Sequence, residues 1–257
     1  MNHLVSAIIL AIIQGITEWI PVSSSGHLVL AERILGFKQS LVFDVALHFG
    51  TLMSVFVYFG KDITDIIQDL FKGKWKTENS KLGFLIIIAT IPAAIAGFFL
   101  KNSAGKIFSS LLTLALGFSV TGLLLIIASL DLKRKNTKLS SKSAFVIGIA
   151  QIFSLLPGVS RSGTTISAGL LLGLKEKTAM KFSFLMSIPI IFGANLLVIG
   201  NNHLPSETIW ATLVSFLVGL LAIHVLYKYV LSSKKNLMWF GIYALILAAI
   251  IAIYVVL

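Results

Sequence analysis

The 257-residue chain is 57% hydrophobic and only 12% charged, and it contains no cysteine. Soluble domains carry about twice this share of charged residues, and several apolar runs reach the roughly 20 residues that cross a bilayer. We therefore predict an all-α polytopic membrane protein, without disulfide or thiolate chemistry. The net charge of +11 comes from loop lysines and arginines, which indicates a positive-inside orientation rather than nucleic-acid binding.

The first apolar segment, residues 4–20, is predicted to be a helix that stops at Pro21, which has no amide hydrogen to donate. Residues 22–40 hold a Ser/Gly turn and a short apolar piece, and neither piece is long enough to span. We expect a re-entrant hairpin here, because non-helical backbone at membrane depth must be buried in protein or line a wet cavity.

Six transmembrane helices are predicted after this hairpin, in two groups of three, at about 41–60, 82–100, 107–130, 182–200, 209–230 and 236–257. Between the groups, residues 144–156 and 163–174 are short apolar stretches on either side of Pro157–Ser162. They predict a second re-entrant helical hairpin.

Loop charge sets the expected orientation. The loops 61–81 and 131–143 each carry five lysines and arginines, whereas 201–208 carries none. With the basic loops inside, both termini lie outside. The first hairpin then enters from the outside and the second from the cytoplasm.

An internal repeat agrees with this topology. A shift of 137 positions aligns Gln14 with Gln151, and nine of the 25 positions from Ile12 to Gly36 are then identical. Each copy holds one hairpin and three spans, an odd number of crossings, so the second copy must be inverted. We predict a single integral membrane domain over 1–257, with inverted-topology repeats at about 1–130 and 144–257 joined by a basic cytoplasmic loop. Such repeats place their site where the halves meet.

Polar groups gather at the first predicted turn. Gln14 and Glu18 share a helix face, and a carboxylate in an apolar region needs a cation or hydrogen-bond donors. Three hydroxyls and an imidazole follow on Ser23, Ser24, Ser25 and His27. Carboxylate, serine and histidine are the parts of a nucleophile with an acid–base pair. Alternatively, the serines cap the next helix and His27 is structural.

The second turn centres on Arg161, the only cation from Ala144 to Leu174. The guanidinium fork suits phosphate oxygens, and a helix beginning near Gly163 would add its amides and dipole. Hydroxyl side chains surround it on Ser160, Ser162, Thr164 and Thr165. The alternative is a structural ion pair between Arg161 and Glu18, which is compatible with a site that holds this pair until substrate arrives.

Two further ionisable residues lie in the span 41–60. His48 is a site candidate because intramembrane polar residues are often functional, with a core histidine as the alternative. Asp44 lies near the outer end and is expected to cap the helix or to reach the interface. We expect His203 and Glu207, in the short outer loop, to bind metal only by accident.

These stretches resemble a known family. Gln14-xxx-Glu18 with Pro21–His27 resembles the first signature of the bacterial undecaprenyl-pyrophosphate phosphatase, or bacitracin-resistance, family, and Pro157–Thr165 resembles the second. Phe43–Thr51 is also similar to that family. The resemblance covers the whole chain in order and spacing. The family pattern admits Glu or Gln at position 14, so this chain lacks one optional carboxylate.

The resemblance implies a hydrolase of the bacterial plasma membrane, open to the outer face, that converts undecaprenyl pyrophosphate to the monophosphate carrier lipid of cell-wall synthesis and confers bacitracin resistance. It implies Ser24 as nucleophile, with His27 as the rival, Glu18 with His27 as the acid–base pair, and Arg161 as a clamp on the pyrophosphate. The clamp would be assisted by Gln14, Ser160, Ser162, Thr164 and Thr165. From their position beside these residues, Ser23, Ser25 and His48 are added as substrate-binding candidates. A divalent cation, Mg²⁺ or Ca²⁺, is a further expectation, although no closed ligand set is evident. A homodimer is compatible with the resemblance.

Two alternatives belong to other classes. A transporter or flippase of a polyprenyl phosphate could use the same inverted-repeat site, but it does not require the Ser/His/Glu cluster. The type-2 phosphatidic-acid phosphatases also carry a Ser-Gly-His piece, but their downstream Arg and His-xxx-Asp arrangement is not found here.

Overall fold

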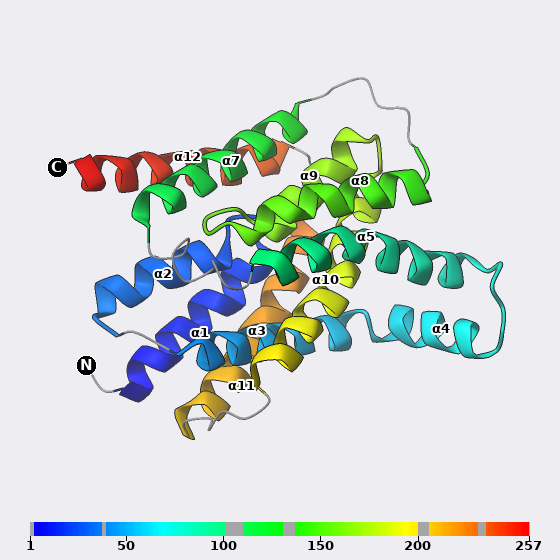
Figure 1. Ribbon diagram of the computed structural model, residues 1–257, viewed down its shortest axis with the longest axis horizontal. Helices are drawn as coiled ribbons and strands as arrows, with labels where there is room; N and C mark the ends of the chain where they lie inside the picture. Colours follow the sequence, from blue (N-terminus) through cyan, green and yellow to red (C-terminus); the bar gives the residue numbers. More distant parts are fainter. Residues whose placement is uncertain are drawn as a thin grey trace.

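The computed structural model describes most of the chain, and Figure 1 shows how its helices are arranged. The described residues are 3–37, 40–100, 110–130, 137–199, 206–230 and 235–256. The start of the predicted span 107–130, up to residue 109, and His203 lie outside these ranges. Within the ranges the regular structure is helical and no strand is present, which confirms the all-α class.

Eleven α-helices are described in these ranges. In chain order they are α1 (His3–Trp19), α2 (Ser24–Leu35), α3 (Leu41–Tyr58), α4 (Gly60–Phe71), α5 (Glu78–Leu100), α7 (Leu111–Ser129), α8 (Ser141–Ile152), α9 (Arg161–Leu171), α10 (Glu176–Ile199), α11 (Ser206–Val225) and α12 (Lys235–Val256). A 3₁₀ turn, Phe153–Leu155, follows α8, and a π-helical turn, Leu226–Val230, follows α11.

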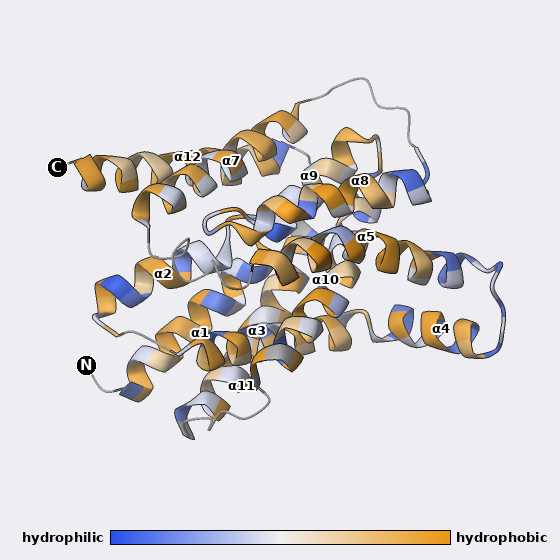
Figure 2. Cartoon of the chain, viewed as in Figure 1, coloured by the Kyte–Doolittle hydropathy of each residue, from blue (hydrophilic) through white to orange (hydrophobic). Residues whose placement is uncertain are grey.

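Six of the described helices, α3, α5, α7, α10, α11 and α12, are long and apolar enough to cross a membrane. Figure 2 shows them mostly in the hydrophobic colour, while hydrophilic residues gather at the turn after α4 and at the start of α8. Large apolar side chains on their outer faces, such as Ile87 and Tyr254, are more than half exposed. The chain is therefore a multi-pass membrane protein, with the predicted number of spans.

Several predicted helix starts and one loop were wrong. α7 begins at Leu111, four residues after the predicted start, and α11 at Ser206, three residues before it. α5 and α10 begin at Glu78 and Glu176, four and six residues before the predicted starts, because an acidic residue in the first turn favours a helix N-terminus. The predicted loop 61–81 contains α4. The apolar residues of α4 recur at helical spacing. One of them, Ile66, packs against α5 at Gly83.

α4 is also tied to α10. Lys181 of α10 donates to a carboxylate oxygen of Asp62 of α4 at 2.5 Å, and both side chains are about one-third exposed. An ion pair at that exposure contributes about 1 kcal/mol or less. Apolar packing on α5 is therefore the main reason that α4 is a helix.

The four shorter helices around the two predicted turns reach the middle of the molecule. α1 runs inward from the end that carries both chain termini, and α2 returns toward that end (Figure 1). α8 and α9 approach the middle from the opposite end. α1 ends at Trp19, just before Pro21, as predicted.

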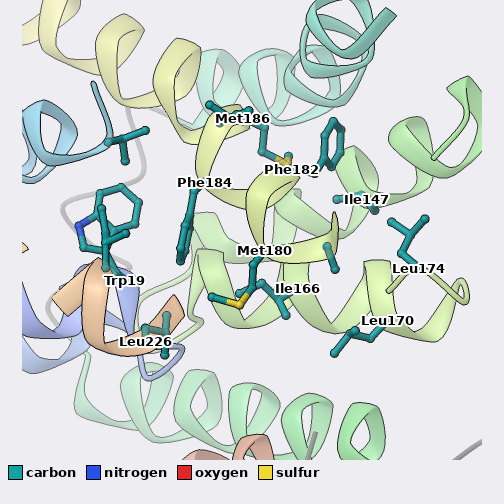
Figure 3. Close-up of a cluster of buried hydrophobic side chains, with 14 of the residues drawn as sticks. Trp19, Ile147, Ile166, Leu170, Leu174, Met180, Phe182, Phe184, Met186 and Leu226 are labelled. Carbon is teal, nitrogen blue, oxygen red and sulfur yellow. The ribbon is translucent and has the colours of Figure 1, made fainter. Parts of the chain in front are cut away.

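A large apolar cluster surrounds these turns. Trp19 is fully buried, and Phe184 of α10 meets it edge to face with ring centroids 5.2 Å apart (Figure 3). Ile166 of α9 and Leu226 lie in the same cluster. The core thus holds α1, α9 and α10 together next to the polar residues of both turns.

Candidate active site

Glu18 is the centre of a buried polar cluster. Its side chain is 6% exposed and lies one residue before Trp19 at the inner end of α1. Its Oε2 atom accepts hydrogen bonds from Ser24 Oγ at 2.5 Å and from Gln14 Nε2 at 3.1 Å. The carboxylate is held by donors on both its own helix and the following turn, as its burial requires.

Arg161 binds the other carboxylate oxygen of Glu18. Its Nη2 atom donates to Glu18 Oε1 at 2.7 Å, and its Nη1 atom donates to the carbonyl of Ser183 at 3.3 Å. The guanidinium carbon lies 5.3 Å from the centre of the Trp19 ring. A cation over a desolvated aromatic face is attracted to it, so Arg161 is fixed from three directions. The predicted Arg161–Glu18 pair is confirmed.

The first turn has an unusual backbone. Ser23 is the N-cap of α2, with φ of 70°, and its hydroxyl accepts from the amide of Gly26 at 3.3 Å. Capping, the alternative weighed for these serines, is therefore confirmed for Ser23. Ser24 begins the helix with its hydroxyl on Glu18, and Ser25 lies 3.4 Å from Ser23 through the two hydroxyls.

The second turn has the same kind of cap, although the backbone of its capping residue is extended. Ser160 caps α9 by accepting from the amide of Gly163 at 3.0 Å, and its hydroxyl lies 3.2 Å from that of Ser162. Thr164 donates back to the Ser160 carbonyl and Thr165 to the Arg161 carbonyl. α9 begins at Arg161 itself, two residues before the expected Gly163. Most of these hydroxyls hold the turn that presents Arg161.

The two turns touch each other. A Cβ placed on Gly26 would lie 3.2 Å from Gly158 Cα, and one placed on Gly163 would lie 3.3 Å from the Pro21 carbonyl oxygen. Only glycine allows backbones to approach this closely. α2 begins at Ser24 and α9 at Arg161, so both helices start close to this contact, and a helix N-terminus favours an anion.

α3 contributes one predicted residue and one that was not predicted. His48 Nε2 lies 3.5 Å from Glu18 Oε2, while its Nδ1 atom is 2.8 Å from the Asp44 carbonyl. Thr51 was missed and lies 3.5 Å from Gln14 Nε2 through its hydroxyl. Its spacing of three residues from His48, on the same helix face, is the signal that could have found it.

The His27 ring contacts the first turn and α12. Its Nδ1 atom lies 2.7 Å from the carbonyl oxygen of Ser23, and its Nε2 atom lies 2.7 Å from the hydroxyl of Tyr243 on α12. Both ring nitrogens are therefore engaged by groups other than Glu18 and Ser24. Nothing in the pattern around Tyr243, an isolated tyrosine in an apolar helix, indicated this contact.

Other supporting residues were also missed. Ser54 accepts from Trp19 Nε1 at 3.1 Å, and the Ser183 hydroxyl lies 2.6 Å from that of Thr165. Within the described ranges, no group of three or more histidine or acidic side chains is arranged to hold a metal ion. The geometry provides a hydroxyl beside a carboxylate, with an arginine and two helix N-termini around them. Such a set can activate a nucleophile and stabilise a phosphate.

Comparison with known proteins agrees with this chemistry. The sequence profile of the family described as "Bacitracin resistance protein BacA" matches residues 7–250. A protein named undecaprenyl-diphosphatase from Caldicellulosiruptor bescii is 44% identical over 254 residues, covering 95% of each chain. A protein of the same name from Methanococcus vannielii is 38% identical over 252 residues, covering 96% of this chain and 99% of its own. One from Christiangramia forsetii is 43% identical over 263 residues, covering 96% and 97%.

Proposed function

This chain belongs to the bacitracin resistance protein BacA family, and on that premise we propose that it hydrolyses undecaprenyl diphosphate to undecaprenyl phosphate and phosphate. The product is the carrier lipid of cell-wall synthesis, and its recycling would confer bacitracin resistance. One observation carries the proposal. The Ser24 hydroxyl lies 2.5 Å from Glu18 Oε2, and the other carboxylate oxygen of Glu18, Oε1, accepts a hydrogen bond from Arg161.

In the proposed reaction, Ser24 Oγ attacks the terminal phosphorus while Glu18 accepts the hydroxyl proton. The bond from that phosphorus to the bridging oxygen breaks, and undecaprenyl phosphate leaves. Water then attacks the phosphoserine, the Oγ–phosphorus bond breaks, and Ser24 regains a proton as phosphate departs. One water is consumed in total.

Arg161 would bind the diphosphate oxygens, because phosphoryl transfer depends on positioning and positive charge around them. The N-termini of α2 and α9 add amide donors. We assign Gln14 and His48 to the alignment of Glu18, since both contact its Oε2. Hydroxyl residues of both turns would shape the phosphate site: Ser23 and Ser25 in the first turn, and Ser160, Ser162, Thr164 and Thr165 in the second. An acid–base role for His27 rests on the family resemblance.

A divalent cation is also part of the proposal. Both oxygens of Glu18 already accept hydrogen bonds, from Arg161, Ser24 and Gln14. These oxygens are therefore not arranged as ligands of a cation bound to the carboxylate. We propose that Mg²⁺ or Ca²⁺, where used, arrives with the diphosphate. Titration of each ion into metal-stripped protein, with phosphate release as the readout, tests this point.

The proposed architecture is an inverted repeat with two re-entrant hairpins, α1–α2 and α8–α9, in one membrane domain. It is supported by the approach of these helix pairs from opposite ends of the molecule (Figure 1) and by the matching caps at Ser23 and Ser160. Both termini lie at the end to which α2 returns. We propose that this end is the outer face of the bacterial plasma membrane, from which the site opens. A homodimer stays a prediction, to be tested by the mass of the solubilised particle.

Phosphate release from undecaprenyl diphosphate by the purified, detergent-solubilised protein tests the function. We expect release by the unchanged chain and by Ser119→Ala, whose hydroxyl donates to the Ala115 carbonyl of its own helix, but not by Ser24→Ala or Arg161→Ala. Absence of release from a folded, lipid-supplemented sample, with and without divalent cations, would contradict hydrolysis. It would favour the alternative, a transporter of a polyprenyl phosphate, which the repeat architecture also suits.

A further inference from the structure

The His27 imidazole is held in one tautomer. Its Nδ1 atom lies 2.7 Å from the Ser23 carbonyl oxygen, and a carbonyl oxygen can only accept, so Nδ1 carries the proton. In a neutral ring Nε2 is then the acceptor. The hydroxyl of Tyr243, 2.7 Å from Nε2, is therefore the donor.

Aromatic packing fixes the orientation of the same ring. Tyr243 stacks on His27 with an angle of 9° between the planes and 5.7 Å between the centroids. Phe118 of α7 meets it edge-on at 87° and 5.4 Å. His27 of α2 is thus held by side chains from α7 and α12, and the contact with Tyr243 joins residues 216 positions apart.

The group that His27 holds is the strained residue of the first turn. Among the described residues, Ser23 is the only non-glycine with positive φ, a sparsely populated conformation that persists only when its surroundings support it. Its carbonyl accepts from the His27 side chain at 2.7 Å and from the His27 amide at 3.2 Å. The next residue is Ser24, whose direction follows from the Ser23 backbone.

We infer that Tyr243 is a positioning residue for the reaction: it orients His27, which holds the strained Ser23 turn and so aims the Ser24 hydroxyl. The inference rests on the proposed function and gives His27 a role through the backbone rather than in proton transfer. Glu18, 2.5 Å from Ser24 Oγ, is then sufficient to accept the serine proton.

Substitution of His27 distinguishes support of the Ser23 backbone from proton transfer. An asparagine at position 27 places an amide nitrogen where Nδ1 lies, and this chain already contains such a bond, from Asn195 Nδ2 to the Ile191 carbonyl four residues earlier at 2.8 Å. His27→Asn can therefore support Ser23 but cannot act as an acid or base at pH 7. His27→Leu can do neither.

We expect His27→Asn to retain at least about ten times the kcat of His27→Leu, the effect of about one well-placed hydrogen bond. The two variants must first give the same unfolding temperature within a few degrees. A kcat for His27→Asn as low as that of His27→Leu would overturn the positioning role and return His27 to proton transfer.

Tyr243→Phe keeps the stacked ring and removes only the hydroxyl. We expect kcat to fall about fivefold with KM unchanged, because one neutral hydrogen bond is lost at a distance from the substrate. Tyr254→Phe, a matched substitution at an exposed tyrosine of the same helix, should leave kcat unchanged. Equal kcat values for Tyr243→Phe and the unchanged chain would remove Tyr243 from the mechanism.

The same assay distinguishes failure of the inference from failure of the function. If the unchanged chain releases no phosphate, the proposed function is wrong. If it releases phosphate and both His27 variants are equally inactive, hydrolysis stands and the positioning role is wrong.

Discussion

Arg161 and Glu18 are 143 positions apart in the chain, yet Arg161 Nη2 lies 2.7 Å from Glu18 Oε1 with the two side chains only 12% and 6% exposed. The pair joins α9 to α1 and thereby the two predicted halves of the molecule. Removing both charges from solvent is costly, and their mutual attraction offsets that cost only while both are present. The ion pair therefore links folding to the proposed chemistry.

Arg161→Ala should leave the Glu18 carboxylate buried without its cation, which costs about 3–5 kcal/mol of unfolding free energy. The double variant Glu18→Gln/Arg161→Ala removes that charge and should regain much of the stability without regaining phosphate release. Thermal unfolding and phosphate release in detergent measure both effects. Equal stability of the single and double variants would show that the charge pair does not stabilise this fold.

His48→Gln should lower kcat/KM about tenfold, because it removes an imidazole that lies 3.5 Å from the Glu18 carboxylate and contributes about one kcal/mol or more through that charge. The matched control is His224→Gln, at an exposed histidine of α11 that packs against the Tyr58 ring. If both variants retain full kcat/KM, His48 is a structural histidine.

Gly158→Ala should prevent the second turn from docking. Gly158 has φ of 84°, and an added Cβ would lie 2.4 Å from the Leu114 carbonyl oxygen. The left-handed conformation alone costs a residue with a side chain about 1–2 kcal/mol. We expect a lower unfolding temperature and little phosphate release.

Gly193→Ala is the control for that substitution. Gly193 lies in α10, and an added Cβ would have no described atom within 4 Å beyond its chain neighbours and the adjacent helix backbone, so alanine should stabilise the helix by about 0.5–1 kcal/mol. A Gly158→Ala variant as stable as Gly193→Ala would contradict the described turn.

The absence of cysteine from the sequence allows orientation to be tested with single thiols. Lys76 and Ser40 are both exposed, and the proposed topology places them on opposite sides of the membrane. Lys76→Cys should react with a membrane-impermeant thiol reagent only from the cytoplasmic side, and Ser40→Cys only from outside. Labelling of both from one side would exclude the proposed arrangement.

The sequence by itself determined the class of the protein, the six spans, the two turns between shorter helices and the residues of the central ion pair. The physical reason is that only a few kinds of backbone structure and side-chain arrangement are stable inside a bilayer. Apolar length predicts spans, and a buried Glu18 requires a partner of opposite charge, which the second turn offers only at Arg161. α4 was missed because its polar face and its lysine-rich flank resemble a loop, whereas its helix depends on packing against α5.

Only the tertiary structure decided which side chains support the site and where His27 points. Thr51, Ser54 and Ser183 are ordinary hydroxyl residues of apolar helices, and their relevance arises from contacts between helices distant in sequence. Tyr243 meets His27 because α12 packs along α7 beside the first turn. Periodicity predicts which face of a helix is apolar. It does not predict which helix packs on that face, and the contact between Tyr243 and His27 depends on that packing.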